Sequence, residues 1–170
     1  MKKKLKKFFL KFFYERKLRS LPIKTFKKSK KINPKILILI DNKLNMKIKD
    51  LSFINDIFSV PPENINFLWF DSNFVFDFPN HSRIDIDDIN FSGKINSSFI
   101  NRKYDILLNF YNRDNIFLKY LSVNVINKFS VGFLMSETKL NDLVFNFAPN
   151  DLTFFKKEII KYYKVINNHI

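Results

Sequence analysis

The stretch YDILLNFYNRDNIFLKYLSVNVINKFSVGF, Tyr104–Phe133, decides the predicted fold. Residues 106–111 form a nearly continuous apolar run of strand length, which is typical of a strand buried on both faces of a parallel sheet. Apolar residues then recur at helical spacing over residues 117–129, and the apolar run 130–135 opens another strand. A strand, a crossover helix and a second strand in one sheet form a right-handed parallel unit in nearly all proteins.

The other apolar segments continue this alternation of strands and helices. Residues 71–98 are expected to be irregular, with an edge strand or two. Because alternating strands and helices indicate the α/β class with a mostly parallel sheet, we expect a single three-layer domain at residues 36–167, Rossmann-like or flavodoxin-like, with about five strands. Further strands are predicted at residues 36–40, 65–70 and 143–147, and further helices at residues 46–58 and 152–166.

Positive charge is concentrated at the start of the chain. The sequence contains 30 Lys and Arg residues and 16 acidic residues, for a net charge of +14. Residues 1–35 hold 15 of the basic residues and a single acid, Glu15, so the remainder of the chain is electrically balanced. Codon bias in an A/T-rich genome could raise the total number of lysines, but it would not confine the excess to one segment.

We expect a basic amphipathic helix at residues 1–19 and a basic linker at residues 20–35. The apolar residues of this helix recur at i, i+3, i+4, i+7 and i+8 and form one stripe. That stripe could dock on the domain and leave the lysines to contact a polyanion such as RNA, dock there with no such partner, or lie on an anionic membrane surface. The stripe comprises Leu5, Phe8, Phe9, Phe12 and Phe13. The candidate nucleic-acid-binding residues are Lys2, Lys3, Lys4, Lys6, Lys7, Lys11, Arg16, Lys17, Arg19, Lys24, Lys27, Lys28, Lys30 and Lys31.

A second candidate site is the rim of the sheet at the carboxyl ends of its strands, where parallel α/β sheets bind their ligands. Polar residues follow the predicted strands at this rim, which makes it a candidate site for a small molecule or a sugar nucleotide. Most proteins of this class have polar capping residues there whether or not they bind a ligand, so topology alone identifies the site. The rim residues are Asp41, Asn42, Asp71, Asn112, Arg113, Ser136, Glu137 and Thr138.

The sequence lacks the residue patterns that several common types of active or binding site require. No glycine-rich loop follows any predicted strand, which argues against standard dinucleotide binding and against a phosphate loop of the ATPase type. The sequence has no cysteine, and its two histidines, His81 and His169, are too far apart to suggest a zinc site. The acidic residues at 85–88 could hold Mg²⁺, but an exposed acidic turn is the favoured interpretation. Ser136 has no evident histidine partner, which argues against a hydrolase triad. Together, these observations favour a protein without an enzymatic activity, a cofactor or a metal.

Four motifs carry a resemblance to a known family: YDILLNFY at 104–111, FSVGF at 129–133, LNDL at 140–143 and FFKKEIIKYY at 154–163. They resemble a family of short uncharacterised bacterial proteins, known only as a domain of unknown function, whose members also begin with a basic helix. The resemblance covers residues 36–167 and implies a bacterial, cytoplasmic protein, but its motifs are core positions and imply no reaction. The same segment is loosely similar to the amino-terminal, Rossmann-like half of heptosyltransferase-like glycosyltransferases, which implies the fold alone.

These observations favour a non-enzymatic accessory protein that binds RNA, or a nucleoprotein surface such as that of a ribosome, through its basic amino-terminal segment. One alternative is a small-molecule or sugar-nucleotide binding domain, a degenerate transferase, that uses the rim. Another is a tether that holds the protein on a membrane surface through the Phe-rich helix. No apolar run in the sequence has the length of a membrane span.

Overall fold

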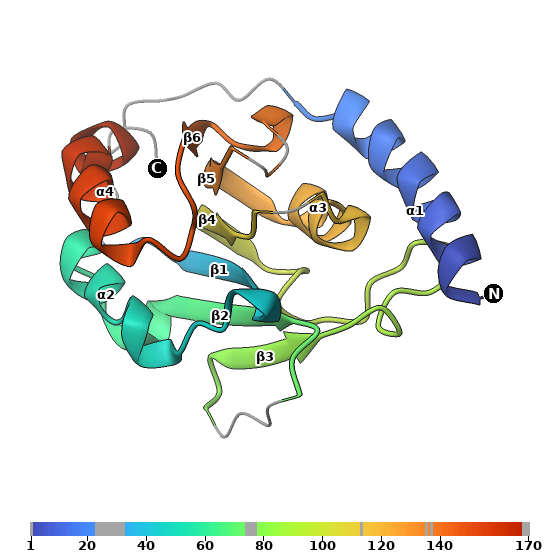
Figure 1. Cartoon of the computed structure of the whole chain (residues 1–170), viewed down its shortest axis with the longest axis horizontal. Coiled ribbons are helices and arrows are strands. Elements are labelled where there is room, and N and C mark those ends of the chain that lie inside the picture. Colours follow the sequence, from blue (N-terminus) through green and yellow to red (C-terminus); the bar gives the residue numbers. More distant parts are fainter. Residues whose placement is uncertain are drawn as a thin grey trace.

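Figure 1 shows the computed structural model of the chain, which describes residues 2–22, 33–73, 78–112, 114–134, 136 and 138–167. This part of the chain contains six strands and four α-helices. The strands are β1 (Ile36–Asp41), β2 (Ile65–Phe70), β3 (His81–Ile84), β4 (Lys103–Phe110), β5 (Ile126–Phe133) and β6 (Leu143–Phe145). The α-helices are α1 (Lys2–Arg19), α2 (Phe53–Phe58), α3 (Ile116–Asn124) and α4 (Leu152–Asn167). Short 3-10 helices are η1 (Asn42–Leu44), η2 (Ile48–Leu51), η3 (Pro62–Asn64) and η4 (Thr138–Leu140).

The six strands are all parallel and pair in the order β3-β2-β1-β4-β5-β6. This is the order of a doubly wound, Rossmann-like sheet, in which the strand order reverses between β1 and β4. The predicted α/β class with a parallel sheet is therefore confirmed. The sheet has six strands, where about five were expected. Its edge strand β3 lies within residues 71–98, where the sequence predicted irregular structure with an edge strand or two.

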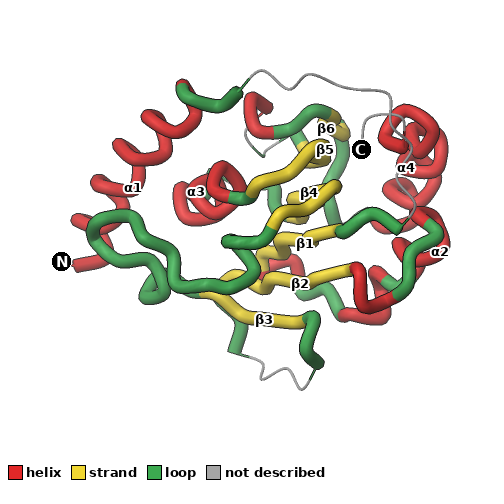
Figure 2. Tube along the Cα trace, turned by 180° about the vertical axis from the view of Figure 1, so that it is seen from behind, coloured by secondary structure: helices red, strands yellow, loops and turns green. Residues whose placement is uncertain are grey.

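Helices cover both faces of the sheet and complete a three-layer domain (Figures 1 and 2). α2 and α4 lie on one face, and α3 lies on the other with α1 outside it. Successive side chains of a strand point to opposite faces. Ile38 of β1 accordingly joins the core under α2 and α4, whereas Leu37 and Leu39 join the core under α3 and α1. Both faces of the central strands are thus buried, as their apolar runs predicted.

Two predicted helices differ from the observed ones. The helix predicted at 117–129 ends at Asn124, because Val125 already has an extended backbone. Phe129 belongs to β5 and packs in the core under α4, on the other side of the sheet from α3. Val125 packs in the core under α3 and Phe129 in the core under α4, so these two residues of the predicted apolar stripe lie on opposite sides of the sheet. The helix predicted at 46–58 is broken into η2 and α2.

α1 packs on α3 through a face that the sequence did not identify. Its buried residues are Lys6, Leu10 and Tyr14, which recur every four positions and form one side of the helix. Leu10 and Tyr14 belong to the core under α3. The aliphatic part of Lys6 is buried, while its Nζ donates to the Ile86 carbonyl at 2.6 Å and lies 3.7 Å from Oδ1 of Asp87. α1 therefore shares a core with the sheet that it precedes in the chain.

Candidate functional site

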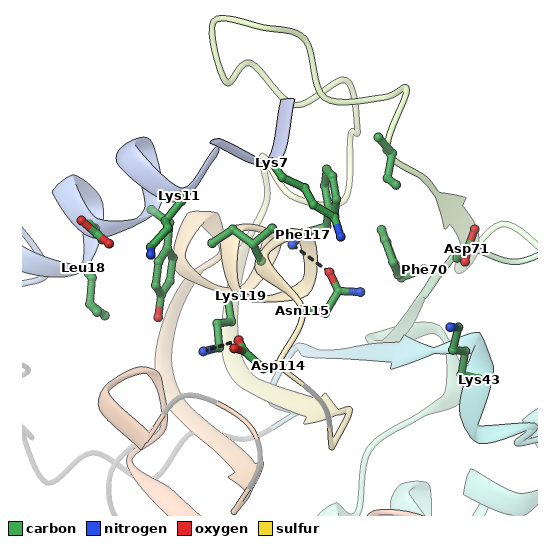
Figure 3. A pocket seen from close by; sticks show the side chains of 14 residues that line it. Lys7, Lys11, Leu18, Lys43, Phe70, Asp71, Asp114, Asn115, Phe117 and Lys119 are labelled. Atoms are coloured by element: carbon green, nitrogen blue, oxygen red, sulfur yellow. Dashed lines mark hydrogen bonds and ion pairs between the residues drawn. The ribbon is translucent and has the colours of Figure 1, made fainter. Parts of the chain in front are cut away.

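An open cavity of about 650 Å³ lies at the carboxyl ends of the central strands, between α1 and the first turn of α3 (Figure 3). Lys43 follows β1, Asp71 follows β2, and Asn115 precedes α3, while Lys7 and Lys11 come from α1. The cavity therefore occupies the point where the strand order reverses, which is where ligands bind in sheets of this type. Its volume falls within the range of small-molecule sites, about 300–1,000 Å³.

Two buried aromatic rings form the inner wall of this cavity. Phe70 ends β2 and Phe117 lies in the first turn of α3; their ring centroids are 6.2 Å apart and their planes are 19° from parallel. Oδ1 of Asn115 accepts a hydrogen bond from the backbone N–H of Phe117 at 3.0 Å and caps α3. Core packing and a helix cap thus fix the ends of β2 and α3 around the cavity.

The lysines of the cavity fall into two sets. Lys119 donates to Oδ1 of Asp114 at 2.8 Å, and this hydrogen bond, the charge of Lys119 and a smaller effect of Lys11 lower the pKa of the Asp114 carboxyl. Asp114 therefore stays ionised at neutral pH and is neutralised by Lys119. By contrast, Lys7, Lys11 and Lys43 form no ion pair with any residue that the structure describes.

The structure brings one of the described rim candidates, Asp71, to this cavity. Asp41 is buried at the end of β1, where its Oδ1 accepts the backbone N–H of Lys43 at 3.1 Å and caps η1. Asn42 and Asn112 are half-buried and do not line the cavity. The prediction based on topology identified the correct end of the sheet for a cavity, but most of the residues around it come from α1 and from the start of α3.

Ser136 is buried beyond β5, away from the cavity. Its Oγ accepts hydrogen bonds from the backbone N–H of Phe133 and from Nδ2 of Asn141, both at 3.0 Å. Oδ1 of Asn141 in turn accepts a hydrogen bond from Nδ2 of Asn109 in β4 at 2.8 Å. These bonds tie the loop after β5 to the centre of the sheet, which is a structural role.

Gly132→Ala is expected to lower the free energy of unfolding by about 1–3 kcal/mol. A Cβ added to Gly132 would lie 2.5 Å from the Asn141 side chain, which bridges Asn109 and Ser136. Urea unfolding measures the loss. In an Asn141→Ala background the clash is removed, so the same glycine substitution should then cost clearly less. An equal loss in the two backgrounds would contradict this close approach.

Four of the five residues of the apolar stripe predicted on α1 do not dock on the domain. They lie on the side of α1 opposite Leu10, so the interpretation in which the whole stripe packs on the protein's own core is wrong. Phe13, its fifth predicted residue, is half-buried and packs against the core. We refer to the exposed residues as the outer stripe: Leu5, Phe8, Phe9 and Phe12.

Much of the positive charge of α1 also remains free of carboxylates. Nζ of Lys17 donates to Oδ1 of Asn124, and Arg19 lies 3.8 Å from Glu15 one turn earlier in the same helix. Within the described residues, no ion pair is formed by Lys4, Lys7, Lys11 or Arg16. Outside the described residues lie Lys24, Lys27, Lys28, Lys30, Lys31, Arg113 and Glu137, and the side chains of Lys2, Lys3 and Thr138.

None of the helices in the described ranges has both the length and the apolar character to cross a bilayer. The same ranges contain no group of three His, Cys, Asp or Glu side chains that could hold a metal ion. In the turn at 85–88, Oδ2 of Asp88 accepts the Asp85 N–H at 2.8 Å and Oδ1 of Asp85 accepts the Asp87 N–H at 2.6 Å. These carboxylates therefore serve to close an acidic turn.

Comparison with known proteins identifies a family for this fold. No curated protein and no solved structure matches the chain, so the loose similarity to heptosyltransferase-like enzymes gains no support. The family described as "Family of unknown function (DUF6913)" matches residues 6–166. That match includes most of α1 together with the sheet, and it agrees with the resemblance to a domain of unknown function. The chain therefore belongs to the DUF6913 family, whose function is unknown.

Proposed function

We propose that the protein attaches peripherally to anionic membrane surfaces through α1. The observation that carries this proposal is the exposure of the outer stripe, since Phe8 and Phe12 are 71% and 59% exposed on a helix whose opposite side is buried in the core. Single exposed apolar residues are ordinary, whereas a contiguous aromatic row on a cationic helix is typical of helices that lie in a membrane interface. α1 would lie in the membrane plane with the outer stripe at the boundary of the acyl chains.

Apolar and electrostatic terms both favour such a surface. Burying one Phe side chain stabilises the bound state by about 1.5–3 kcal/mol. Each Lys or Arg held near an anionic bilayer contributes about 1 kcal/mol more. Lys4 and Arg16 lie beside the outer stripe on α1 and form no ion pair within the described residues. Their charge is therefore available to lipid headgroups.

The same cations could contact RNA phosphates, which the sequence alone favoured. Proteins that stack bases on aromatic side chains do so within a cationic groove that follows the nucleic-acid backbone. The outer stripe instead lies on the convex surface of a helix, and it includes Leu5, which offers no ring for stacking. The stripe therefore supports a lipid surface better than RNA, and RNA binding becomes a competing outcome of the test.

Cosedimentation of the full chain with phosphatidylcholine vesicles, with and without phosphatidylglycerol, tests the proposal. We expect binding to vesicles that contain phosphatidylglycerol. We expect at least about a tenfold loss of affinity in the Phe8→Ser/Phe12→Ser variant, which keeps every charge. The matched control is Phe154→Ser/Ile160→Ser, which removes two exposed apolar side chains from α4 and should bind as the unaltered protein does.

Equal affinities of the two double variants would overturn the proposal. It would also be overturned if the unaltered protein ignored anionic vesicles and bound single-stranded RNA instead. Added salt should weaken vesicle binding, because the cations of α1 are solvent-accessible and are screened.

A further inference from the structure

We propose that the cavity at the strand ends binds a small phosphate ester through the ammonium groups of Lys7, Lys11 and Lys43. The cavity has the volume of a small-molecule site, and these three lysines line it without an ion pair to any described residue. The proposal does not rest on membrane attachment, because the outer stripe lies on a different side of α1 and none of its residues lines the cavity.

The turn after β1 explains why side chains would hold the phosphate. In sheets of this order a phosphate usually rests on free backbone N–H groups of a glycine-rich turn at that position. Here the N–H of Lys43 donates to Oδ1 of Asp41 at 3.1 Å, and the N–H of Asn45 donates to the Asn42 carbonyl at 3.0 Å. These two groups are bonded within the turn, so we assign the phosphate contacts to the cationic side chains around the cavity.

The three lysines come from two elements that the core holds in place. Lys7 and Lys11 are one helical turn apart and therefore lie on the same side of α1. Figure 3 shows Lys7 extending from α1 toward the Asn115 end of α3, while Lys43 enters from the β1 side of the cavity. Leu10 fixes α1 against the core, so Lys7 and Lys11 are held on one side of the cavity, and Lys43 lies on the opposite side (Figure 3).

The acidic residues of the cavity narrow the class of ligand. Asp71 lines it together with the lysines and forms no ion pair within the described residues, whereas Glu15 is paired with Arg19 and the charge of Asp114 is already neutralised by Lys119. A carboxylate accepts hydrogen bonds from hydroxyl groups and repels additional phosphates. The lining therefore suits a phosphate ester that also carries hydroxyl groups, as sugar phosphates and nucleotides do, better than a bare polyphosphate.

Isothermal titration of the full chain with ribose 5-phosphate, adenosine diphosphate and inorganic pyrophosphate tests this site. We expect at least one hydroxyl-bearing ester to bind, and Lys43→Gln to weaken its binding by about tenfold or more. The matched control is Lys49→Gln, because Lys49 is exposed on η2, away from the cavity, and should leave the affinity unchanged. Asp71→Asn should weaken the binding of the hydroxyl-bearing ester more than the binding of pyrophosphate.

The site would be ruled out if none of the three probes bound at millimolar concentration, or if Lys43→Gln and Lys49→Gln had the same effect. A third outcome would also overturn the ester site: the protein binds none of the free probes, and Lys43→Gln abolishes vesicle binding. The phosphate that Lys43 recognises would then belong to a lipid. The Phe8→Ser/Phe12→Ser variant should keep its affinity for the ester. The ester site and membrane attachment can therefore fail separately.

Discussion

Leu10→Ala is expected to lower the free energy of unfolding by about 2–5 kcal/mol. Leu10 is 1% exposed in the middle of α1 and belongs to the core that α1 and α3 form over the sheet. Truncation to alanine removes apolar contacts and leaves a void between two helices that cannot fully close. Urea or guanidinium unfolding of the full chain measures the loss, with an unchanged denaturant slope as the check on a two-state transition.

The matched control is Leu5→Ala in the same helix. Leu5 is 52% exposed on the outer stripe, so the same chemical change should alter stability by no more than about 0.5 kcal/mol. Similar losses in the two variants would show that α1 is not packed through its Leu10 side. Because Leu10 is part of the core, deletion of α1 would expose that core. A loss of binding in the deletion variant could then result from unfolding, whereas point variants on the outer stripe leave the core intact.

In α1 the helical periodicity of apolar residues did not identify the buried side. The helix has apolar residues on two opposite sides, the outer stripe and the side that contains Leu10 and Tyr14. The sequence favoured the longer apolar stripe as the docking side, yet the shorter one is buried. Lys6 lies within the buried side, and a lysine at such a position predicts an exposed side of the helix. In the structure its aliphatic part is buried and its Nζ donates to the Ile86 carbonyl.

The strands that are buried on both faces were predictable, because a continuous apolar run of strand length identifies them. The apolar runs at 36–40, 65–70 and 106–111 correspond to β1, β2 and the end of β4, and the class followed from their alternation with helices. The order of the strands was not predictable, because it depends on which strands pair with each other. No local pattern in the sequence specifies that pairing. The switch point between β1 and β4, and hence the position of the cavity along the carboxyl edge of the sheet, emerged only from the pairing.

The sequence predicted which end of the sheet carries the cavity, but not most of the residues that line it. Asp71 was expected because it follows a strand, and the polar interruption before Ile116 marked the start of α3. Lys7 and Lys11 come from a helix at the far end of the chain, and they reach the rim only because α1 packs beside α3. No spacing within the sequence brings these segments together, so this contribution depended on tertiary packing.

Phe155→Ala is expected to have the largest effect on stability, a loss of about 3–5 kcal/mol. Phe155 is fully buried at the start of α4, and its ring packs 5.0 Å from that of Phe110 and 5.7 Å from those of Phe133 and Phe145. It therefore joins α4 to β4, β5 and β6 at once. For a chain of this size each kcal/mol lowers the melting temperature by about 2–4 °C, so thermal unfolding should resolve the change readily.

The adjacent Phe154→Ala provides the control, because Phe154 is 42% exposed and contacts Phe147 at the edge of the same helix. It should cost less than about 1 kcal/mol. Comparable losses at the two positions would mean that α4 does not use the Phe155 side to cover the sheet. Since α4 lies across the sheet from α1 and the cavity, Phe155→Ala protein that remains folded should bind anionic vesicles and phosphate esters with unchanged affinity, which separates the stability of the domain from both proposed activities.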